Sequence, residues 1–482
     1  MPSRDPDRPN ILFILTDDQG PWAMGCARTP ELQTPNLDRL AASGARFENF
    51  FCASPVCSPA RASILTGQIP SQHGVQDFLE KGNSDQLPRD GRSVQFMKGA
   101  SSYVQVLAAN GYECGLSGKW HLGDSAAPQL GFDFWNVHGA GGGDYNDAPM
   151  FTDGSLYYPN GYVTDVITDH AIGFLEDQSA SDQPFSLNVH YTAPHSPWEE
   201  GQHPQSLFDQ YFNNCDFASI PDEPIHPNQV ALRQMVGYTP ELRREALSGY
   251  FASITAMDAQ VGRLLDWLEA RNLLESTLVV FTSDNGMNMG HHGIWGKGNA
   301  TYPQNMFDTA VKVPSLASQP GRVPAGQVRG EMLSQYDFRP TILEWLGLQD
   351  VTGLNLPGSS FAAELAGAPA QANRPVVVYD EYGPTRMIRT GRLKYVHRYP
   401  DGPNEFYDLE DDPNEKANMV DDPSRSIDIA QLRSQLEEWF LRYVDPEIDG
   451  AAQPNVGCGQ IDRIDSGEEA FLGELVFGTK GP

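Results

Sequence analysis

The chain has 482 residues, 40% of them hydrophobic and 20% charged, a composition that excludes wholesale disorder, collagen-like repeats and a coiled coil. Its 63 acidic residues against 33 Lys and Arg give a net charge of −30, which repels phosphate backbones, so we expect no nucleic-acid partner. An anionic substrate would need a metal ion or a local cluster of cations to reverse this field.

The N-terminal residues 1–10 are polar, and the apolar run at residues 11–15 is too short for a signal peptide. No segment approaches the ~18 apolar residues of a membrane span. The six cysteines are scattered, without CxxC pairs or zinc spacing, which suits a reducing compartment. We therefore expect a cytoplasmic protein that has no membrane partner.

Strands and helices alternate along most of the chain. Residues 10–15 form an unbroken apolar run typical of a buried parallel strand. Thr239 is a favourable N-cap and Pro240 suits the first position of a helix whose apolar face continues to residue 268. Further elements are expected at 102–109 (helix), 112–119, 185–191 and 277–282 (strands). This alternation predicts a mainly parallel sheet with right-handed crossovers.

The last quarter of the chain has a different pattern. Residues 363–373 are rich in Ala, Gly and Pro, which indicates a linker. A strand at 376–380, a hairpin with strands at 387–388 and 393–399, and a helix at about 428–443 predict a small antiparallel α+β unit. The acidic, Gly-rich tail is either disordered or an arm that packs on another subunit, which would give a homo-oligomer. We predict three units, at 1–370, 371–445 and 446–482.

Polar side chains follow two of the expected strands. Asp17 and Asp18 come after the first strand, and Asp284 and Asn285 come after the strand at 277–282. Ligands of open α/β sheets bind outside the carboxyl ends of the strands. An all-oxygen set suits a hard cation, Ca²⁺ or Mg²⁺, better than zinc. The alternative is that these residues only start loops, as Asp and Asn commonly do.

A second cluster is centred on Cys57. Pro59 suits the first turn of a helix and Gly67 its end, so Cys57 is expected at a helix N-terminus, where the dipole favours an anion. Arg61 follows one turn later. Taken alone, this pattern indicates a thiolate nucleophile with a low pKa, or else a buried cysteine that caps a helix.

A third cluster lies between Gly118 and Gly123, directly after an expected strand. It contains Lys119, in a chain where lysine is scarce, and His121. By spacing alone, this cluster indicates either a functional loop or a solvated one.

Together, these residues resemble the type I, formylglycine-dependent sulfatases of the alkaline phosphatase superfamily. The resemblance covers most of the chain and rests on motifs that occur in the family's order, at 9–19, 57–61, 65–67, 118–123, 193–195, 282–286, 296–298, 406–409, 412–413 and 418. It implies an α/β fold, an alkaline-phosphatase-like mostly parallel sheet flanked by helices, with a smaller C-terminal antiparallel α+β domain.

In that family a separate formylglycine-generating enzyme oxidises the cysteine to an aldehyde, which hydrates to a geminal diol. The resemblance therefore implies that Cys57 is the precursor of the nucleophile. One hydroxyl attacks sulfur and expels the alcohol, and the second lets the covalent sulfate leave by elimination. A serine would perform the first step but would remain as a stable sulfate ester.

The resemblance also implies a role for each matching residue. Arg61 orients the diol, whereas Lys119 and Lys297 neutralise the nonbridging oxygens of the sulfate. His121 takes the proton for the elimination, and His195 protonates the leaving oxygen. The metal, expected to be Ca²⁺ rather than Mg²⁺ or Mn²⁺, is bound by residue 57 together with Asp17, Asp18, Asp284 and Asn285.

We thus predict a cytoplasmic sulfatase that hydrolyses a small sulfate ester, with an aryl, choline-like or sugar leaving group. One alternative is a phosphonate monoester or phosphodiester hydrolase with the same formylglycine machinery. A second alternative is a protein without enzymatic activity, an anion-binding or structural relative in which Cys57 stays unmodified.

Overall fold

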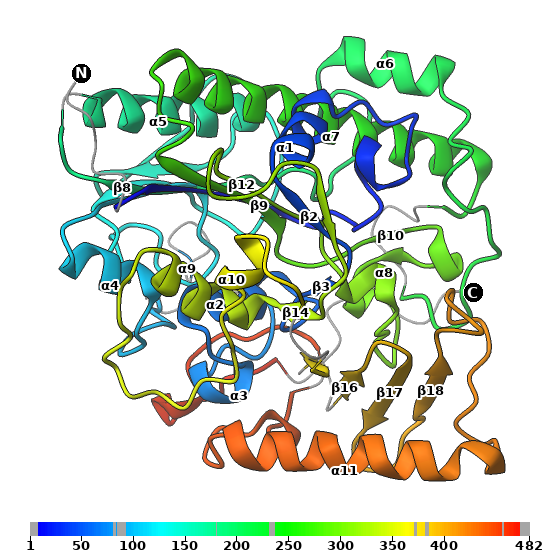
Figure 1. Cartoon of the computed structure of the whole chain (residues 1–482). Coiled ribbons are helices and arrows are strands. Elements are labelled where there is room, and N and C mark those ends of the chain that lie inside the picture. Colours follow the sequence, from blue (N-terminus) through cyan, green and yellow to red (C-terminus); the bar gives the residue numbers. More distant parts are fainter. Residues whose placement is uncertain are drawn as a thin grey trace.

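The structure is a computed structural model that describes residues 8–80, 83, 93–179, 181–230, 237–370, 374–380, 385–455 and 457–472. A ten-stranded sheet crosses the molecule (Figure 1). Its strands, from one edge to the other, are β13 (Gln327–Arg329), β2 (Ala45–Phe47), β12 (Ser315–Ser318), β9 (Thr277–Ser283), β1 (Asn10–Thr16), β8 (Phe185–His190), β4 (Glu113–Lys119), β5 (Phe134–His138), β6 (Met150–Thr152) and β7 (Ser155–Tyr157).

The five central strands, from β9 to β5, run parallel to one another, whereas β12, β6 and β7 are antiparallel to their neighbours. Strand β1 lies between β8 and β9, and its residues 11–15 are fully buried because both faces of the sheet are covered. The predicted fold class is therefore confirmed.

Two groups of helices cover the sheet (Figure 1). On one face lie α1 (Pro35–Ser43), α5 (Val163–Gln178), α6 (Gln205–Asn214) and α7 (Pro240–Ala270). On the other face lie α2 (Cys57–Thr66), α3 (Pro70–His73), α4 (Tyr103–Ala109), α8 (Asp308–Val311), α9 (Phe338–Trp345) and α10 (Ala362–Leu365). Helix α7 begins as predicted, since the Thr239 side chain accepts a hydrogen bond from the backbone N–H of Leu242. Helix α10 occupies the start of the predicted linker, which is therefore not wholly irregular.

Two short strand pairs complete the main unit, namely β3 (Phe50–Phe51) with β14 (Leu333–Ser334) and β10 (Asn288–Met289) with β11 (Trp295–Gly296). A separate antiparallel sheet follows, made of β15 (Val376–Asp380), β16 (Thr385–Arg389), β17 (Leu393–Arg398) and β18 (Glu405–Asp408). Helix α11 (Ser426–Tyr443) packs across this small sheet and buries Leu432, Leu436 and Phe440 against it.

Buried charges join the small sheet to the main unit. The Asp308 carboxylate of α8 accepts hydrogen bonds from Lys394 of β17 at 3.0 Å and from Arg389 of β16 at 3.2 Å. The Lys394 ammonium also contacts Glu415 at 2.5 Å, and a Glu415 oxygen accepts from the Asp308 backbone N–H. Burial opposes ionisation of Asp308, yet the charges of Lys312, Lys394 and Arg389 hold the pKa of its carboxyl well below the usual range.

The tail beyond α11 packs against its own chain. The backbone N–H of Asp445 donates to the Ser71 carbonyl, and residues 457–472 lie along residues 76–80. Participation of this tail in a homo-oligomer stays a prediction, as do the three domain boundaries.

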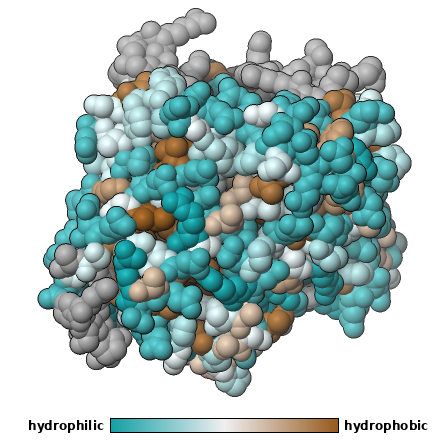
Figure 2. Space-filling view, turned by 90° about the horizontal axis from the view of Figure 1, so that it is seen from above, coloured by the Kyte–Doolittle hydropathy of each residue, from teal (hydrophilic) through white to brown (hydrophobic). Residues whose placement is uncertain are grey.

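The surface over α5, α6 and α7 is mostly hydrophilic, with small separate apolar spots (Figure 2). None of the helices in the described ranges combines the length and the apolar character that crossing a membrane requires.

Candidate active site

The two predicted carboxylate pairs meet at one edge of the main sheet. Strands β1 and β9 are parallel neighbours, and Thr16 lies opposite Ser283, so the residues that follow each strand emerge side by side. The Asp284 carboxylate accepts a hydrogen bond from the backbone N–H of Asp18 at 3.1 Å, and the Asn285 amide donates to Asp18 Oδ1 at 2.8 Å. Asp18 adopts a left-handed conformation with φ of 64°, which turns the chain sharply after β1.

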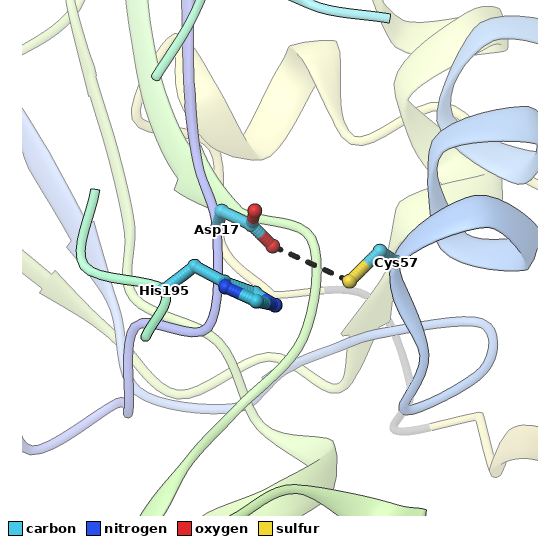
Figure 3. Close-up of side chains that lie close together, drawn as sticks. All are labelled: Asp17, Cys57 and His195. Carbon is cyan, nitrogen blue, oxygen red and sulfur yellow. Dashed lines mark hydrogen bonds between the residues drawn. The ribbon is translucent and has the colours of Figure 1, made fainter. Parts of the chain in front are cut away.

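Cys57 is the first residue of α2 and points at this edge (Figure 3). Its thiol donates to Asp17 Oδ1 at 3.3 Å, and His195 lies beside the pair. The Lys297 ammonium contacts both Cys57 Sγ and Asp18 Oδ1 at 2.7 Å. The helix ends as predicted, with Gly67 in the left-handed conformation at φ of 71°.

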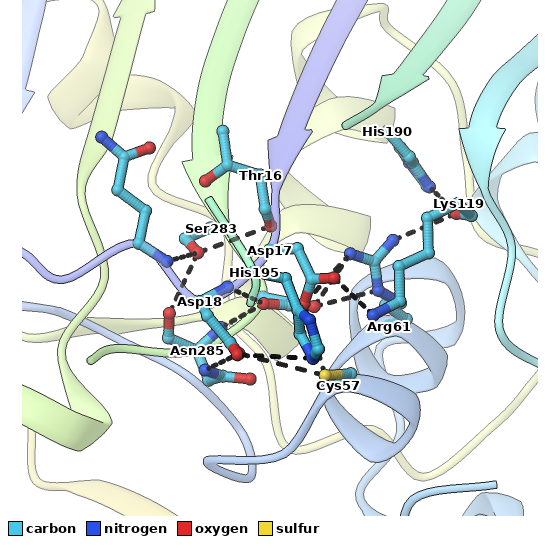
Figure 4. A network of polar contacts seen from close by, with 12 residues as sticks. Thr16, Asp17, Asp18, Cys57, Arg61, Lys119, His190, His195, Ser283 and Asn285 are labelled. Atoms are coloured by element: carbon cyan, nitrogen blue, oxygen red, sulfur yellow. Dashed lines mark hydrogen bonds and ion pairs between the residues drawn. The ribbon is translucent and has the colours of Figure 1, made fainter. Parts of the chain in front are cut away.

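Arg61 and Lys119 tie the carboxylates together from the other side (Figure 4). Arg61, one turn into α2, donates to Asp284 Oδ2 through Nε at 3.0 Å and to the Lys119 carbonyl through a terminal nitrogen at 3.1 Å. Lys119, the last residue of β4, contacts Asp17 Oδ2 at 2.5 Å. The side chains of these two cations and of their partners Asp17 and Asp284 are at most 1% exposed. A local group of cations thus stands inside a protein of strongly negative net charge.

These charges move the pKa values of the site in opposite directions. Burial opposes ionisation of Asp17, but the cations around it, Lys119 foremost, hold its pKa well below the usual range. Burial and the Asp17 charge raise the pKa of Asp284 to about 7. Burial and Asp17 also raise the pKa of the Cys57 thiol to about 12. The thiolate that the helix position alone suggested is therefore disfavoured.

The oxygen atoms at this edge can hold a divalent cation. Ligand atoms of Asp17, Asp18 and Asp284 all lie within 4.8 Å of one another, and those of Asp17, Cys57 and His195 do as well. Asn285 Oδ1 is buried and has no hydrogen-bond partner among the described residues. A buried amide oxygen without a donor, beside three carboxylates, fits a hard cation that accepts oxygen ligands.

The two predicted histidines differ in exposure and in hydrogen-bond partner. His195 keeps 25% of its side chain exposed, and its Nδ1 donates to the Ser196 carbonyl at 2.7 Å, so Nε2 faces Asp18 Oδ2 at 3.7 Å. His121 is buried, and its Nε2 donates to the Leu79 carbonyl at 3.3 Å. Burial, with the charges of Lys119 and Arg61, holds the pKa of His121 well below the usual range, so the ring is neutral.

Sequence reasoning missed two residues that hold this edge in place. The buried Gln335 amide donates to the carbonyls of Ser283 and Asp284, and its oxygen accepts from the Ala53 N–H, so it joins β9 to the segment before Cys57. The Tyr250 hydroxyl of α7 donates to the Asp18 carbonyl at 2.9 Å. Tyr250 lies within the predicted apolar face of this helix, and nothing in the spacing reveals a hydrogen bond from its hydroxyl to a distant loop.

A glycine-rich loop lies against both histidines. A Cβ atom on Gly141 would stand 2.3 Å from His121 Nε2, and one on Gly142 would stand 3.0 Å from the His195 ring. Only a residue without a side chain fits at Gly141 while His121 stays in place.

We expect Gly141→Ala to lower kcat about 100-fold, because the new methyl group must displace the His121 ring, and a shift of ~1 Å costs about that much. Steady-state kinetics on the folded variant provide the measurement. Gly330→Ala is the matched control, since a Cβ there has nothing within 4 Å, and it should keep full activity. Wild-type kcat in Gly141→Ala would show that the His121 position is not critical.

Comparison with known proteins identifies the family. The family model described as Sulfatase matches residues 9–348, and one described as N-sulphoglucosamine sulphohydrolase, C-terminal, matches residues 290–441. An N-acetylglucosamine-6-O-sulfatase of Bacteroides thetaiotaomicron is 29% identical, with 92% of this chain and 88% of the relative covered. An ulvan-active sulfatase of Formosa agariphila is 30% identical, with 84% of this chain and 75% of the relative covered.

Solved structures agree with this result. A protein determined in complex with its substrate, D-glucosamine-2-N,6-O-disulfate, superposes with a TM-score of 0.73 at 26% identity and covers 92% of this chain and 100% of its own. A phosphonate monoester hydrolase of Agrobacterium radiobacter has a TM-score of 0.68 at 20% identity, with 91% and 96% covered, and shares the fold.

The family model, the relatives and the solved structures together show a member of the alkaline phosphatase-like superfamily, with a polar cluster at the carboxyl edge of its main sheet. The chain belongs to the sulfatase family. As its homologues and structural neighbours indicate, the protein is a sulfuric ester hydrolase, which confirms the predicted class of enzyme.

Proposed function

We propose that the protein hydrolyses a sulfate ester of a small sugar, with formylglycine at position 57 and Ca²⁺ at the carboxyl edge of the sheet. The proposal rests on the cluster of Arg61, Lys119 and Lys297 around Cys57. The side chains of Arg61 and Lys119 are buried and that of Lys297 is 11% exposed, in a protein of net charge −30. Cations held in a site that excludes water attract a sulfate group and stabilise the charge that develops on its oxygens. One relative is an N-acetylglucosamine-6-O-sulfatase, and one similar solved structure is a complex with D-glucosamine-2-N,6-O-disulfate; both support a small sugar as the leaving group.

The metal would be held by Asp17, Asp18, Asp284 and Asn285 together with residue 57. When bound, Ca²⁺ lowers the pKa of a neighbouring hydroxyl and attracts a sulfate oxygen. Arg61 already donates to Asp284, so its guanidinium is positioned to orient the group at residue 57. The Lys297 ammonium, 2.7 Å from Cys57 Sγ, stands where it would contact a sulfate held at that atom.

The two histidines supply proton transfer in this proposal. Neutral His121 accepts a proton at Nδ1, because its Nε2 hydrogen is engaged by the Leu79 carbonyl. His195 donates a proton from Nε2 to the leaving oxygen, since its Nδ1 hydrogen is engaged by Ser196. Burial lowers the pKa of His195, and the charges of Asp17 and Asp18 oppose that effect.

The test is kcat/KM on a matched pair, an aryl sulfate and an aryl phosphonate monoester, for protein produced together with a formylglycine-generating enzyme. We expect the sulfate to be preferred by several powers of ten, each worth ~1.4 kcal/mol of differential transition-state binding. A preference for the phosphonate would overturn the proposed reaction. A second comparison, of kcat/KM for N-acetylglucosamine 6-sulfate and for the aryl sulfate, then tests the leaving group. We expect the sugar sulfate to be preferred.

A further inference from the structure

The C-terminal segment, residues 457–472, lies beside residues 76–80, the stretch that follows α3, and the two meet in a single isolated β-bridge. Gln460 pairs with Leu79 in parallel register. Its backbone N–H donates to the Phe78 carbonyl at 2.8 Å, and its carbonyl accepts from the Glu80 N–H at 3.2 Å. The segment is drawn in red near α3 in Figure 1. Residues almost four hundred positions apart in the sequence therefore share one set of backbone hydrogen bonds.

The Gln460 side chain fixes this pairing. It is fully buried, and its oxygen accepts from the Gln76 N–H at 2.8 Å. Its amide nitrogen donates to the carbonyls of Gly74 at 2.9 Å and Asp462 at 3.0 Å. A buried amide whose groups are satisfied on both sides holds one geometry, because any shift would leave a buried polar atom without a partner.

The loop held in this way reaches the active site through Leu79. Its backbone N–H donates to the hydroxyl of Ser58, the neighbour of Cys57, at 3.3 Å. Its carbonyl lies 3.3 Å from His121 Nε2. Because a carbonyl can only accept a hydrogen bond, Nε2 carries the hydrogen and Nδ1 carries the lone pair. His121 Nδ1 is buried and has no partner among the described residues, so it is available to a bound group.

We propose that residues 457–472 act as a strap that sets the orientation and tautomer of His121 through the Leu79 carbonyl, with Gln460 as a positioning residue. The expected change in kcat rests on the proposed function, in which His121 Nδ1 accepts a proton. Without the strap, the loop at 76–80 loses the hydrogen bonds that Gln460 makes to Gln76, Phe78 and Glu80, and the hydrogen bond that selects the Nε2–H tautomer weakens.

The experiment compares the full-length wild type with Gln460→Ala by two readouts. Nitrogen-15 NMR of the histidine side chains, with His121→Gln to assign the signal, should show the Nε2–H tautomer in the wild type and a mixture in the variant. For an aryl sulfate, kcat should fall about tenfold or more while KM changes less than about twofold, because substrate contacts remain. Gln453→Ala, a half-buried position in the tail before this segment, is the matched control and should leave both readouts unchanged.

A folded Gln460→Ala protein with the wild-type His121 tautomer and wild-type kcat would overturn the proposal. If that variant does not fold, Gly459→Ala replaces it. Gly459 has φ of 110°, and a Cβ there would stand 2.8 Å from Glu80 Cβ. The pairing of Gln460 with Leu79 must therefore shift, although the buried Gln460 amide is still present. If the wild type does not hydrolyse sulfate esters, the proposed function fails, whereas the NMR comparison still decides the role of the strap.

Discussion

Replacing Cys57 by serine is expected to abolish repeated turnover, with a loss of at least about 10⁴-fold in kcat, or ~5.5 kcal/mol. Cys57 is the first residue of α2, and Lys297, Asp17 and Asp18 converge on its sulfur. A serine has one hydroxyl, so it can attack sulfur but has no second hydroxyl to expel the sulfate. Rapid-quench kinetics should therefore show at most one alcohol released per protein, and the intact mass should show the trapped ester.

Cys215→Ser provides the control, because Cys215 is a partly buried thiol outside the polar cluster at the sheet edge. It should keep wild-type activity. Many turnovers by Cys57→Ser at an undiminished rate would show that the second hydroxyl of a geminal diol is not required at residue 57. A thiolate mechanism is addressed in the same experiment, because protein made without the formylglycine-generating enzyme keeps the Cys57 thiol and should be inactive.

Removing divalent metal is expected to abolish activity and to lower the thermal midpoint. Three carboxylates converge at the carboxyl edge of the sheet, and a cation bound only by the folded state stabilises it by about 2.7 kcal/mol at 100 times its Kd. Calorimetry after chelation and on adding back Ca²⁺ measures the effect. Asn285→Ala removes the amide oxygen that has no partner in the described part of the chain, and should lose most of the Ca²⁺ response.

The Ca²⁺ response should also depend on pH. The pKa of Asp284 in the folded, metal-free protein is raised to about 7 from its ordinary 3.8. Between these values the folded state holds a proton on Asp284 that the unfolded chain has lost, so the contribution of Asp284 to metal-free stability falls as pH rises through this window. Because Ca²⁺ needs the ionised carboxylate, its stabilising effect should be larger at about pH 8 than at about pH 5.5.

Asn136→Ala, in β5 and away from the carboxylates, should respond to Ca²⁺ like the wild type. Equal thermal unfolding midpoints with and without Ca²⁺ in the wild type would show that no Ca²⁺ binds at the carboxyl edge at the concentration used.

Much of this site was predictable because its residues follow strong local signals. The apolar runs of β1 and β9 fixed where each strand ends, and the pairs Asp17–Asp18 and Asp284–Asn285 follow directly. Pro59 and Gly67 marked the limits of α2, which placed Cys57 at a helix start. The rule that ligands gather at the carboxyl edge of a parallel sheet predicted that both pairs share one edge, whereas the adjacency of β1 and β9 is seen only in the folded chain.

The supporting residues could not be predicted, because their partners are distant in sequence. Gln335 and Gln460 are polar residues in segments without periodicity, and only the folded chain shows which carbonyls they meet. Tyr250 fitted the apolar face of α7, so its hydroxyl gave no signal of its own. Sequence periodicity reports which face of an element is buried, whereas long-range hydrogen bonds depend on tertiary packing.

The buried charges around Asp308 limit how this enzyme can be recombined with its relatives. Strands β16 and β17 supply Arg389 and Lys394 to a carboxylate that belongs to the main unit. A chimera cut near residue 370 would leave Asp308 with its neighbour Lys312 unless the incoming part brought equivalent cations at both positions. Since breaking a buried ion pair costs about 3–5 kcal/mol, grafts that ignore this match should fail to accumulate as folded protein. The small sheet and the Asp308 carboxylate that it neutralises therefore have to be exchanged together.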